Sequence, residues 1–330
     1  MPVATILVPM RNAERYVRET LDSLLQDDID LQIVVIDDHS SDRSAALVRA
    51  CADSRVSLIP GPGRGISAAL NAGLAQARAP LVMRCDADDL YPIGRIARQI
   101  DWLQKNPQFG AVCGGFCAID SRGRFVAELP TGLQEEELTA ELRAGQTRTH
   151  LGAFAMRAQL LRSIGGFRHF FITAEDIDVQ LRLARSARVM YVPGECYRYR
   201  LHDLSVTHTQ ARAQRLQYAE VAYRLQRQRR ADGRDDLDLG LEAALQASLQ
   251  ALAPTAPDPA TPHLLGCIEG AAWIAHAQGQ RFTALRTAAR ALRYRRWHPA
   301  PWRTLLALLL KPVGVPAAAR QRATAPGSDA

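Results

Sequence analysis

Acidic residues follow two apolar segments of the sequence at the point where each segment ends. The segment "LQIVVIDD" ends in Asp38, and the segment "LVMRCDADD" ends in Asp86, Asp88 and Asp89. Two carboxylates about 4 Å apart repel each other by roughly 4 kcal/mol at an effective dielectric constant near 20. A positively charged group or ion is therefore expected beside Asp86, Asp88 and Asp89. A few oxygen ligands suit Mg²⁺ or Mn²⁺, which also bind nucleotide phosphates, and Asp88 is the residue we assign to such a metal.

Each of these acids also has an ordinary structural interpretation. Asp42 in "DDHSSD" suits the cap of a following helix, and Asp89 could cap the helix that follows Pro92. "DADD" as a whole could be a solvated turn. A cap does not require Asp38, however, and a carboxylate at the end of a second strand is suited to accept hydrogen bonds from a ribose or a base.

The segments that must position these acids alternate between apolar strands and amphipathic helices. Continuous apolar strands separated by single helices predict a parallel, doubly wound sheet covered by helices on both faces, with ligands at the carboxyl ends of the strands. We expect strands over 3–9, 31–38, 55–60, 79–86, 149–157 and 188–193, with two more around the turn "DSRGR", and helices over 13–26, 41–52, 66–78, 94–106, 134–145 and 174–186.

Three further motifs carry candidate site residues. The loop "GPGRG" could bring Arg64 or backbone N–H groups to a nucleotide, although such a run is a weak signal alone. No GxGxxG follows the first strand, which disfavours a dinucleotide-binding protein. The motif "AEDID" contains Glu175 and Asp176, which would also suit the start of an ordinary helix. "CYRYRLHDLSVTH" follows the last predicted strand and contains His202.

Taken in order, these motifs resemble the family 2 glycosyltransferases, which are inverting nucleotide-sugar enzymes of GT-A fold. The resemblance covers about residues 3–210. It rests on the order of "VPMRNAERYVRETLDSLLQ", "IVVIDDHSSD", "GISAALNAGLAQARAPLVMRCDADD", "GGF" at 165–167, "EDIDVQLRL" and "YRLHDLSVT".

The resemblance implies a donor site and a metal site. It places Pro9, Asn12 and the neighbouring Arg11 at the nucleotide base, and it implies that Asp38 hydrogen-bonds the base. Arg11 and His39 depart from residues that are frequent in the family, and both would lie beside the nucleotide. UDP is nevertheless the favoured nucleotide.

Metal binding and catalysis involve a second set of residues. Asp86 and Asp88 match the family's DxD motif and imply Mn²⁺ or Mg²⁺, with Asp86 near the ribose or the metal and His202 as a further metal ligand. Asp176 matches the general base, and Glu175 would help to hold the acceptor or the sugar. General-base assistance is worth about 10²–10⁴-fold in rate.

The expected reaction is transfer of one sugar from a nucleotide-diphosphate sugar to a hydroxyl of a glycan or glycolipid, with inversion. No QxxRW follows the "ED" motif, which favours transfer of a single sugar over processive synthesis. Two alternatives remain open. One is a metal-dependent nucleotidyltransferase, for which neither of the two lysines is suitably placed. The other is a non-catalytic nucleotide-sugar-binding or scaffold protein.

The charge of the chain is unevenly distributed. Residues 1–210 hold 24 basic and 25 acidic side chains, whereas residues 211–330 hold 17 and 9, which accounts for the net charge of +7. We therefore predict a catalytic domain over 1–210 and a basic helical region over 211–330, with "APTAPDPATPH" (253–263) as a linker. The acid-free segment 281–311 could pack on the catalytic domain, or it could contact anionic lipid, which would suit a lipid-linked saccharide acceptor. Its charge would fit nucleic acid too, but no nucleic-acid-binding motif accompanies it.

Compartment follows from two observations. The six cysteines are scattered, which indicates a reducing compartment. "MPVATILVPMRN" has no basic residues before its apolar run, so it is predicted as a first strand rather than a secretion signal. We expect a cytoplasmic bacterial enzyme of polysaccharide biosynthesis for the cell envelope, with a peripheral contact at the inner face of the membrane.

Overall fold

The computed structural model describes residues 1–129, 131–205, 212–249 and 259–312. Within these ranges the chain divides into two compact units. The first comprises residues 1–116, 131–200 and 204–258, and the second comprises 117–130, 201–203 and the residues from 259 onward. The predicted functional division at residue 210 stays a prediction. The tail of the chain, residues 206–208 of the last motif and residues 253–258 of the expected linker lie outside the described residues.

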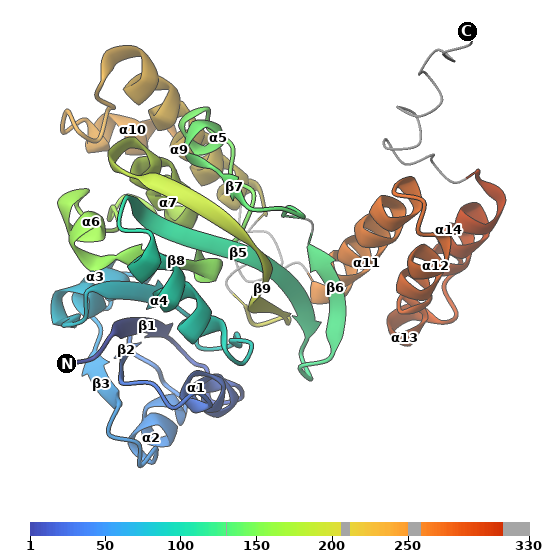
Figure 1. Cartoon of the computed structure of the whole chain (residues 1–330), viewed down its shortest axis with the longest axis horizontal. Coiled ribbons are helices and arrows are strands. Elements are labelled where there is room, and N and C mark those ends of the chain that lie inside the picture. The colour runs from blue at the N-terminus through green and yellow to red at the C-terminus, as the bar shows by residue number, and fades with distance from the viewer. Residues whose placement is uncertain (130, 206–211, 250–258, 313–330) are drawn as a thin grey trace, which may run out of the picture. The chain divides into compact units, whose positions relative to one another are not determined.

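A long mixed sheet forms the centre of the first unit (Figure 1). Its strand order is β3-β2-β1-β4-β8-β5-β9-β7. β1, β2, β3 and β4 run parallel to one another, as expected. The strands are β1 (Ala4–Met10), β2 (Leu31–Asp37), β3 (Val56–Pro60), β4 (Leu81–Arg84), β5 (Phe109–Asp120), β7 (Glu136–Glu137), β8 (Phe154–Arg157) and β9 (Arg188–Leu201).

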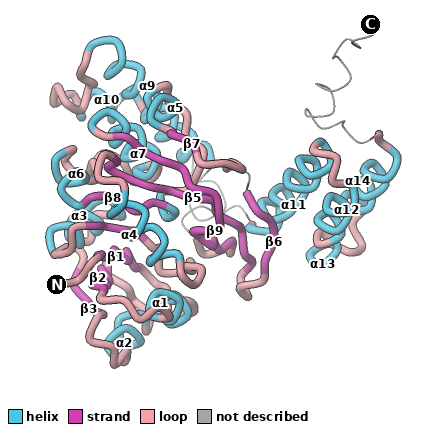
Figure 2. Tube along the Cα trace, viewed as in Figure 1, coloured by secondary structure: helices cyan, strands magenta, loops and turns pink. Residues whose placement is uncertain are grey.

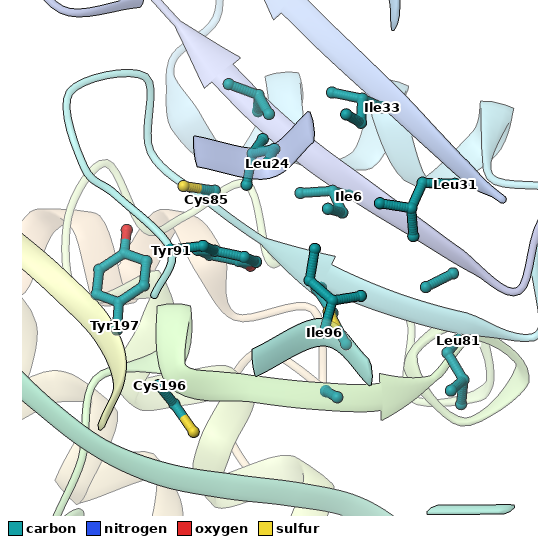
Figure 3. Packing of buried hydrophobic residues seen from close by; sticks show 14 of the residues in the cluster. Ile6, Leu24, Leu31, Ile33, Leu81, Cys85, Tyr91, Ile96, Cys196 and Tyr197 are labelled. Atoms are coloured by element: carbon teal, nitrogen blue, oxygen red, sulfur yellow. The ribbon is translucent and has the colours of Figure 1, made fainter. Parts of the chain in front are cut away.

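Helices cover both faces of this sheet, because the central strands bury alternate residues on opposite sides. In β1, Ile6 and Val8 pack on one side with helices α1, α2 and α4, whereas Leu7 packs on the other side with α3, α6 and α7. Figure 3 shows the first of these clusters around Ile6 and Tyr91. The helices of the first unit are α1 (Val17–Leu25), α2 (Ser44–Arg49), α3 (Ile66–Gln76), α4 (Arg95–Lys105), α5 (Thr139–Arg143), α6 (Ala158–Ser163), α7 (Glu175–Ser186), α9 (Arg212–Asp232) and α10 (Glu242–Ser248).

The sheet changes direction at β8, which is antiparallel to both β4 and β5. The expected strand over 149–157 is shorter than predicted, because a 3₁₀ turn, η1 (Leu151–Ala153), occupies its first half. The expected helix over 134–145 is likewise divided into β7 and α5.

The last strand is longer than the sequence indicated. β9 continues through "GECYRYRL" to Leu201, so residues 196–201 of the motif that was expected to follow the strand are part of it. The polar residues of this segment do not give the apolar pattern expected of a buried strand. Tyr197 and Arg200 are nevertheless both buried, at 0% and 1% exposure. The carboxyl half of β9 therefore runs through the interior of the first unit.

The second unit is mainly helical. It contains α11 (Ala260–Ala277), α12 (Arg281–Ala289), α13 (Leu292–Arg295) and α14 (Pro299–Leu310), together with β6 (Phe125–Leu129), which pairs with the end of β5 (Figure 2). Residues 260–263 of the expected linker are the first turn of α11. Tyr294 donates a hydrogen bond to Asp120 at 2.9 Å, and the Ala260 amide donates to Asp203 at 2.7 Å. In the described part of the chain, no helix combines the length and the apolar character that a membrane crossing requires.

Candidate active site

The carboxyl ends of the four parallel strands place their following loops at one edge of the sheet. The register pairs Met10 with Asp37 and Leu7 with Arg84. Asp37 in turn pairs with Pro60. The segments that begin at residues 11, 38, 61 and 85 therefore leave the sheet side by side, as the parallel order predicted.

Asp38 is buried, and its carboxylate accepts hydrogen bonds from the neighbouring loop. Oδ1 accepts from the amide of Gly63 at 2.7 Å, and Oδ2 accepts from the amide of Gly65 at 3.2 Å. A Cβ on Gly61 would lie 2.7 Å from Oδ1 of Asp38, so only glycine permits this close approach. Because an ionised carboxylate has about four acceptor positions, Asp38 can still accept a bond from a base. Arg64 of the same loop is exposed.

Asn12 and its neighbours form the next part of this edge. Asn12 has a positive φ of +52°, and its Oδ1 accepts a hydrogen bond from the Ser41 amide at 2.8 Å. Arg11 is exposed and Pro9 is partly buried. The loop after β1 is thereby attached to the loop after β2. Asp42 was expected to cap α2; the N-cap residue is Arg43 instead, but the Asp42 carboxylate accepts from the Ser44 amide at the start of the helix.

A buried arginine connects the two acidic motifs. Arg84, the last residue of β4, is 3% exposed. Its Nε and Nη2 donate to the two oxygens of Asp86 at 2.7 and 3.1 Å, and its Nη1 donates to Glu175 at 2.9 Å. Burial alone would lower the pKa of Arg84, but Asp86 and Glu175 raise it, so the guanidinium stays charged. This is the positive partner that the acidic turn requires.

Glu175 and Asp176 begin α7, and Ala174 before them has a positive φ of +61°. Burial raises the pKa of both carboxyl groups, and Arg84 opposes that rise in each. Asp178, the third acid of the motif, has another role. It is fully buried and pairs with Arg182 at 2.8 Å.

Asp89 does not cap the next helix, because α4 begins at Arg95 after Gly94. Instead it is buried, and its carboxylate accepts from the Tyr197 hydroxyl and from the Arg200 amide, each at 2.6 Å. Burial and the neighbouring acid Asp88 raise the pKa of Asp89. The hydroxyl of Tyr197 also accepts a bond from the Asp86 amide at 3.2 Å, so β9 fixes the shape of the acidic turn.

His150 is a further residue of this region that the sequence analysis did not single out. Its ring stacks on Tyr197, with ring centroids 4.9 Å apart, and its Nδ1 accepts from the Gly152 amide at 3.0 Å. Burial lowers the pKa of His150 to about 4, against the opposing effect of Asp86. The imidazole is therefore neutral near pH 7.

Sequence reasoning also missed Arg84, Tyr197 and Arg200. A signal for Arg84 was present, because an arginine inside an apolar strand is rarely buried without acidic partners. His202 lies in the second unit, and its predicted role as a metal ligand stays a prediction.

The fit of a divalent metal can be judged from the oxygen ligands present. Among the described residues, no group of three or more His, Cys, Asp or Glu side chains could hold a metal ion. Both oxygens of Asp86 already accept from Arg84. Mg²⁺ and Mn²⁺ commonly bind one or two carboxylates and complete their coordination with water and substrate phosphates. Asp88, with a donor diphosphate, fits that pattern.

The sequence is similar to those of known glycosyltransferases. Residues 5–165 match the sequence model of a family described as "Glycosyl transferase family 2". The glycosyltransferase EpsJ of Bacillus subtilis is 29% identical over 218 residues, which is 63% of this chain and 63% of EpsJ. The match thus spans less than two thirds of that relative.

Solved structures show the same fold. S. aureus TarS 1–349 in complex with UDP-GlcNAc aligns with a TM-score of 0.59 at 14% identity, over 92% of this chain and 90% of TarS. The mannosyltransferase PcManGT from Pyrobaculum calidifontis, in complex with GDP-Man and Mn²⁺, aligns with a TM-score of 0.53 at 23% identity, over 94% of this chain and 85% of PcManGT. The first unit therefore has the expected GT-A type of sheet, and the chain continues into further helices.

Proposed function

Residues 5–165 place this chain among the family 2 glycosyltransferases, and on that premise we propose that it transfers one sugar from a nucleotide-diphosphate sugar to a hydroxyl of a saccharide acceptor. One observation carries the proposal. The ion pairs that the buried Arg84 forms with Asp86 and Glu175 join the acidic turn after β4 to the start of α7. The groups expected at the diphosphate and at the acceptor are thereby held in one cluster.

Asp176 is the proposed general base. It would remove the proton from the acceptor hydroxyl, whose oxygen attacks the anomeric carbon from the face opposite the leaving diphosphate. A single displacement of this kind inverts the configuration and needs no second nucleophile. Burial raises the pKa of Asp176, which makes it a stronger base than an exposed aspartate. Glu175, held by Arg84, would position the acceptor or the sugar.

The donor side is proposed around Asp38, Asp86 and Asp88. Asp38 offers acceptor oxygens for a base N–H, and Asp88 would hold Mg²⁺ or Mn²⁺ at the diphosphate. When bound, such a metal neutralises the charge that develops on the leaving group. UDP is the nucleotide that we favour. An acceptor carboxylate alone does not separate uracil from guanine, since both present an N–H donor, so the nucleotide is decided by measurement.

The deciding experiment measures nucleoside diphosphate release from a panel of nucleotide sugars with Mn²⁺ and bacterial envelope glycans or glycolipids. We expect release with one donor, its loss in chelator, and a fall of about 10²–10⁴-fold in kcat for Asp176→Asn. In Asp88→Ala, Mn²⁺ should no longer stimulate the release of nucleoside diphosphate. Asp101→Asn is the matched control, because Asp101 is an exposed acid that forms an ion pair with Lys105. Proton NMR of the product tests inversion of the anomeric carbon.

Two outcomes would contradict the proposal. The first is that neither wild-type protein nor Asp88→Ala releases nucleoside diphosphate from any donor. The chain would then bind nucleotide sugars without catalysis, as expected of a scaffold protein. Release of inorganic diphosphate from a nucleoside triphosphate would indicate a nucleotidyltransferase. The proposed acceptors include a saccharide on a lipid carrier.

A further inference from the structure

Helix α14 of the second unit has an exposed apolar face. Trp302, Leu306, Leu309 and Leu310 are 54%, 57%, 48% and 75% exposed. Their spacing of four, three and one residues places them along one side of a helix. We call these four residues the outer face of α14.

The outer face is not needed for the core of the second unit. The opposite side of α14 supplies that core through Leu308, which is fully buried against Ala272, Ala284 and their neighbours on α11 and α12. Figures 1 and 2 show these three helices lying beside one another. A helix that needed only to pack on α11 and α12 would present polar residues on its free side.

Two more aromatic side chains lie near the ends of the outer face. Arg281 donates a hydrogen bond to the carbonyl of Leu309, which brings the start of α12, with Phe282 at 90% exposure, to the last turn of α14. At the other end, Trp302 donates to the carbonyl of Arg296 at 2.8 Å. Trp297, next to Arg296, is 87% exposed. The apolar surface thus extends beyond the helix, which is itself about 18 Å long.

Positive charge surrounds this surface. Residues 281–311 contain eight arginine and lysine residues and no acidic residue. Arg293, Arg295 and Arg296 are all exposed in the segment before α14. Exposed leucine and tryptophan beside arginines are complementary to a surface with an apolar interior and an anionic outer layer. A second protein copy offers no such complementarity, because it would bring a second set of arginines to the same surface.

We propose that the outer face of α14, with Phe282 and Trp297, binds anionic lipid membranes and lies in the plane of the headgroups. The use of such binding rests on the proposed function: a transferase held at a membrane meets lipid-linked acceptors at high local concentration. The binding itself needs neither donor nor acceptor.

The test is co-sedimentation of the full chain with vesicles of neutral phosphatidylcholine and with vesicles that contain anionic phosphatidylglycerol. We expect binding to the anionic vesicles at low salt and its loss in 0.5 M salt. At that salt concentration the Debye length is short, so the attraction between the arginines and the anionic lipids is screened. Leu306→Ser should weaken binding about tenfold or more. Replacing Arg293, Arg295 and Arg296 with Gln should weaken it about fivefold per arginine. Brominated lipid should quench tryptophan fluorescence in wild type and less in Trp302→Phe.

Leu239→Ser is the matched control. Leu239 is 56% exposed, as Leu306 is 57% exposed, but it lies in the first unit. The Leu239→Ser variant should bind anionic vesicles as wild type does. Circular dichroism of each variant shows whether the fold is retained. Asp88→Ala should bind vesicles as wild type does, so a failure of the enzymatic proposal is recognised separately.

Three results would overturn the inference. The first is absence of binding to anionic vesicles at low salt. The second is equal binding by wild type and Leu306→Ser. The third is a dimer in sedimentation velocity that Leu306→Ser dissociates, without any vesicle binding, since a second copy would then cover the outer face.

Discussion

Arg84 is the residue on which the candidate site depends most. Its guanidinium bonds reach both the acidic turn and α7, through two hydrogen bonds to Asp86 and one to the buried Glu175. A buried charge that loses its partner costs about 3–5 kcal/mol of stability. The arginine therefore has two effects. It makes burial of the acids tolerable, and it holds their charged forms.

Arg84→Met should move the acid limb of the pH profile. A base acts only when ionised, and Arg84 opposes the burial that raises the pKa of Asp176. Without Arg84 that pKa rises further. As the pH is lowered, kcat/KM of the variant should therefore begin to fall at a higher pH than that of wild type. The measurement is kcat/KM against pH for wild type, Arg84→Met and Arg84→Lys. The lysine keeps the charge and should restore the position of the limb in part.

Arg43→Met is the control for this series, because Arg43 forms an exposed pair with Glu14. An acid limb that stays in place in Arg84→Met, in protein that remains folded, would show that Arg84 does not govern the base.

His150 should make the stability of the fold depend on pH. Its pKa is lowered from 6.5 to about 4, so the unfolded chain binds a proton more readily than the folded chain between these values. The free energy of unfolding should therefore fall as the pH falls from about 6.5 toward 4, by up to about 3 kcal/mol. Urea denaturation at several pH values measures this effect.

His150→Asn supplies the comparison, since an asparagine oxygen can still accept from the Gly152 amide but does not titrate. The variant should lose this part of the pH dependence. An identical pH dependence in both proteins would assign it to other groups.

At the scale of elements, the loop between β3 and α3 is shaped by its contact with the end of β2. A Cβ at Gly61 would lie 2.7 Å from Oδ1 and 2.8 Å from the Cα of Asp38. Gly61→Ala should displace Asp38 at a cost of about 1–3 kcal/mol and raise the Kd for the nucleotide donor. Calorimetric titration with the donor or its diphosphate measures the change.

Gly270→Ala is a suitable control, because a Cβ there meets nothing within 4 Å. It lies in α11, where alanine favours the helix by about 1 kcal/mol. Unchanged donor affinity in Gly61→Ala would mean that Asp38 is not part of the donor site.

The sequence predicted these elements well where one strong periodicity was present. The first four strands and the helices between them lie within a few residues of their expected positions, because each strand is apolar and each helix has one apolar face. Prediction was poorer for several elements after residue 131, although α7 lies within one residue of its expected position. β8 is only four residues long, and the second half of β9 contains Tyr197 and Arg200, whose burial depends on Asp89 and Asp88 more than a hundred residues away. Local patterns do not contain that information.

At the scale of the whole molecule, the sequence predicted the fold class and the presence of helices after residue 211. It did not predict that residues 117–130 and 201–203 would belong with those helices. The bonds from Tyr294 to Asp120 and from Ala260 to Asp203 join segments far apart in the chain, and neither has a motif. In the candidate site the acids were expected from their motifs, whereas the basic and aromatic residues that hold them were not.

The positive φ values have a consequence for engineering the protein. Among the described residues, the three non-glycine positions with positive φ are Asn12, His39 and Ala174, and all adjoin candidate site residues. A left-handed alanine costs roughly 1 kcal/mol or more, so glycine at 174 would relieve that strain while loosening the segment before Glu175 and Asp176. Given the proposed roles of Glu175 and Asp176, directed evolution for heat tolerance alone would then favour glycine at a position where turnover would favour alanine. Such a campaign should therefore screen both properties together.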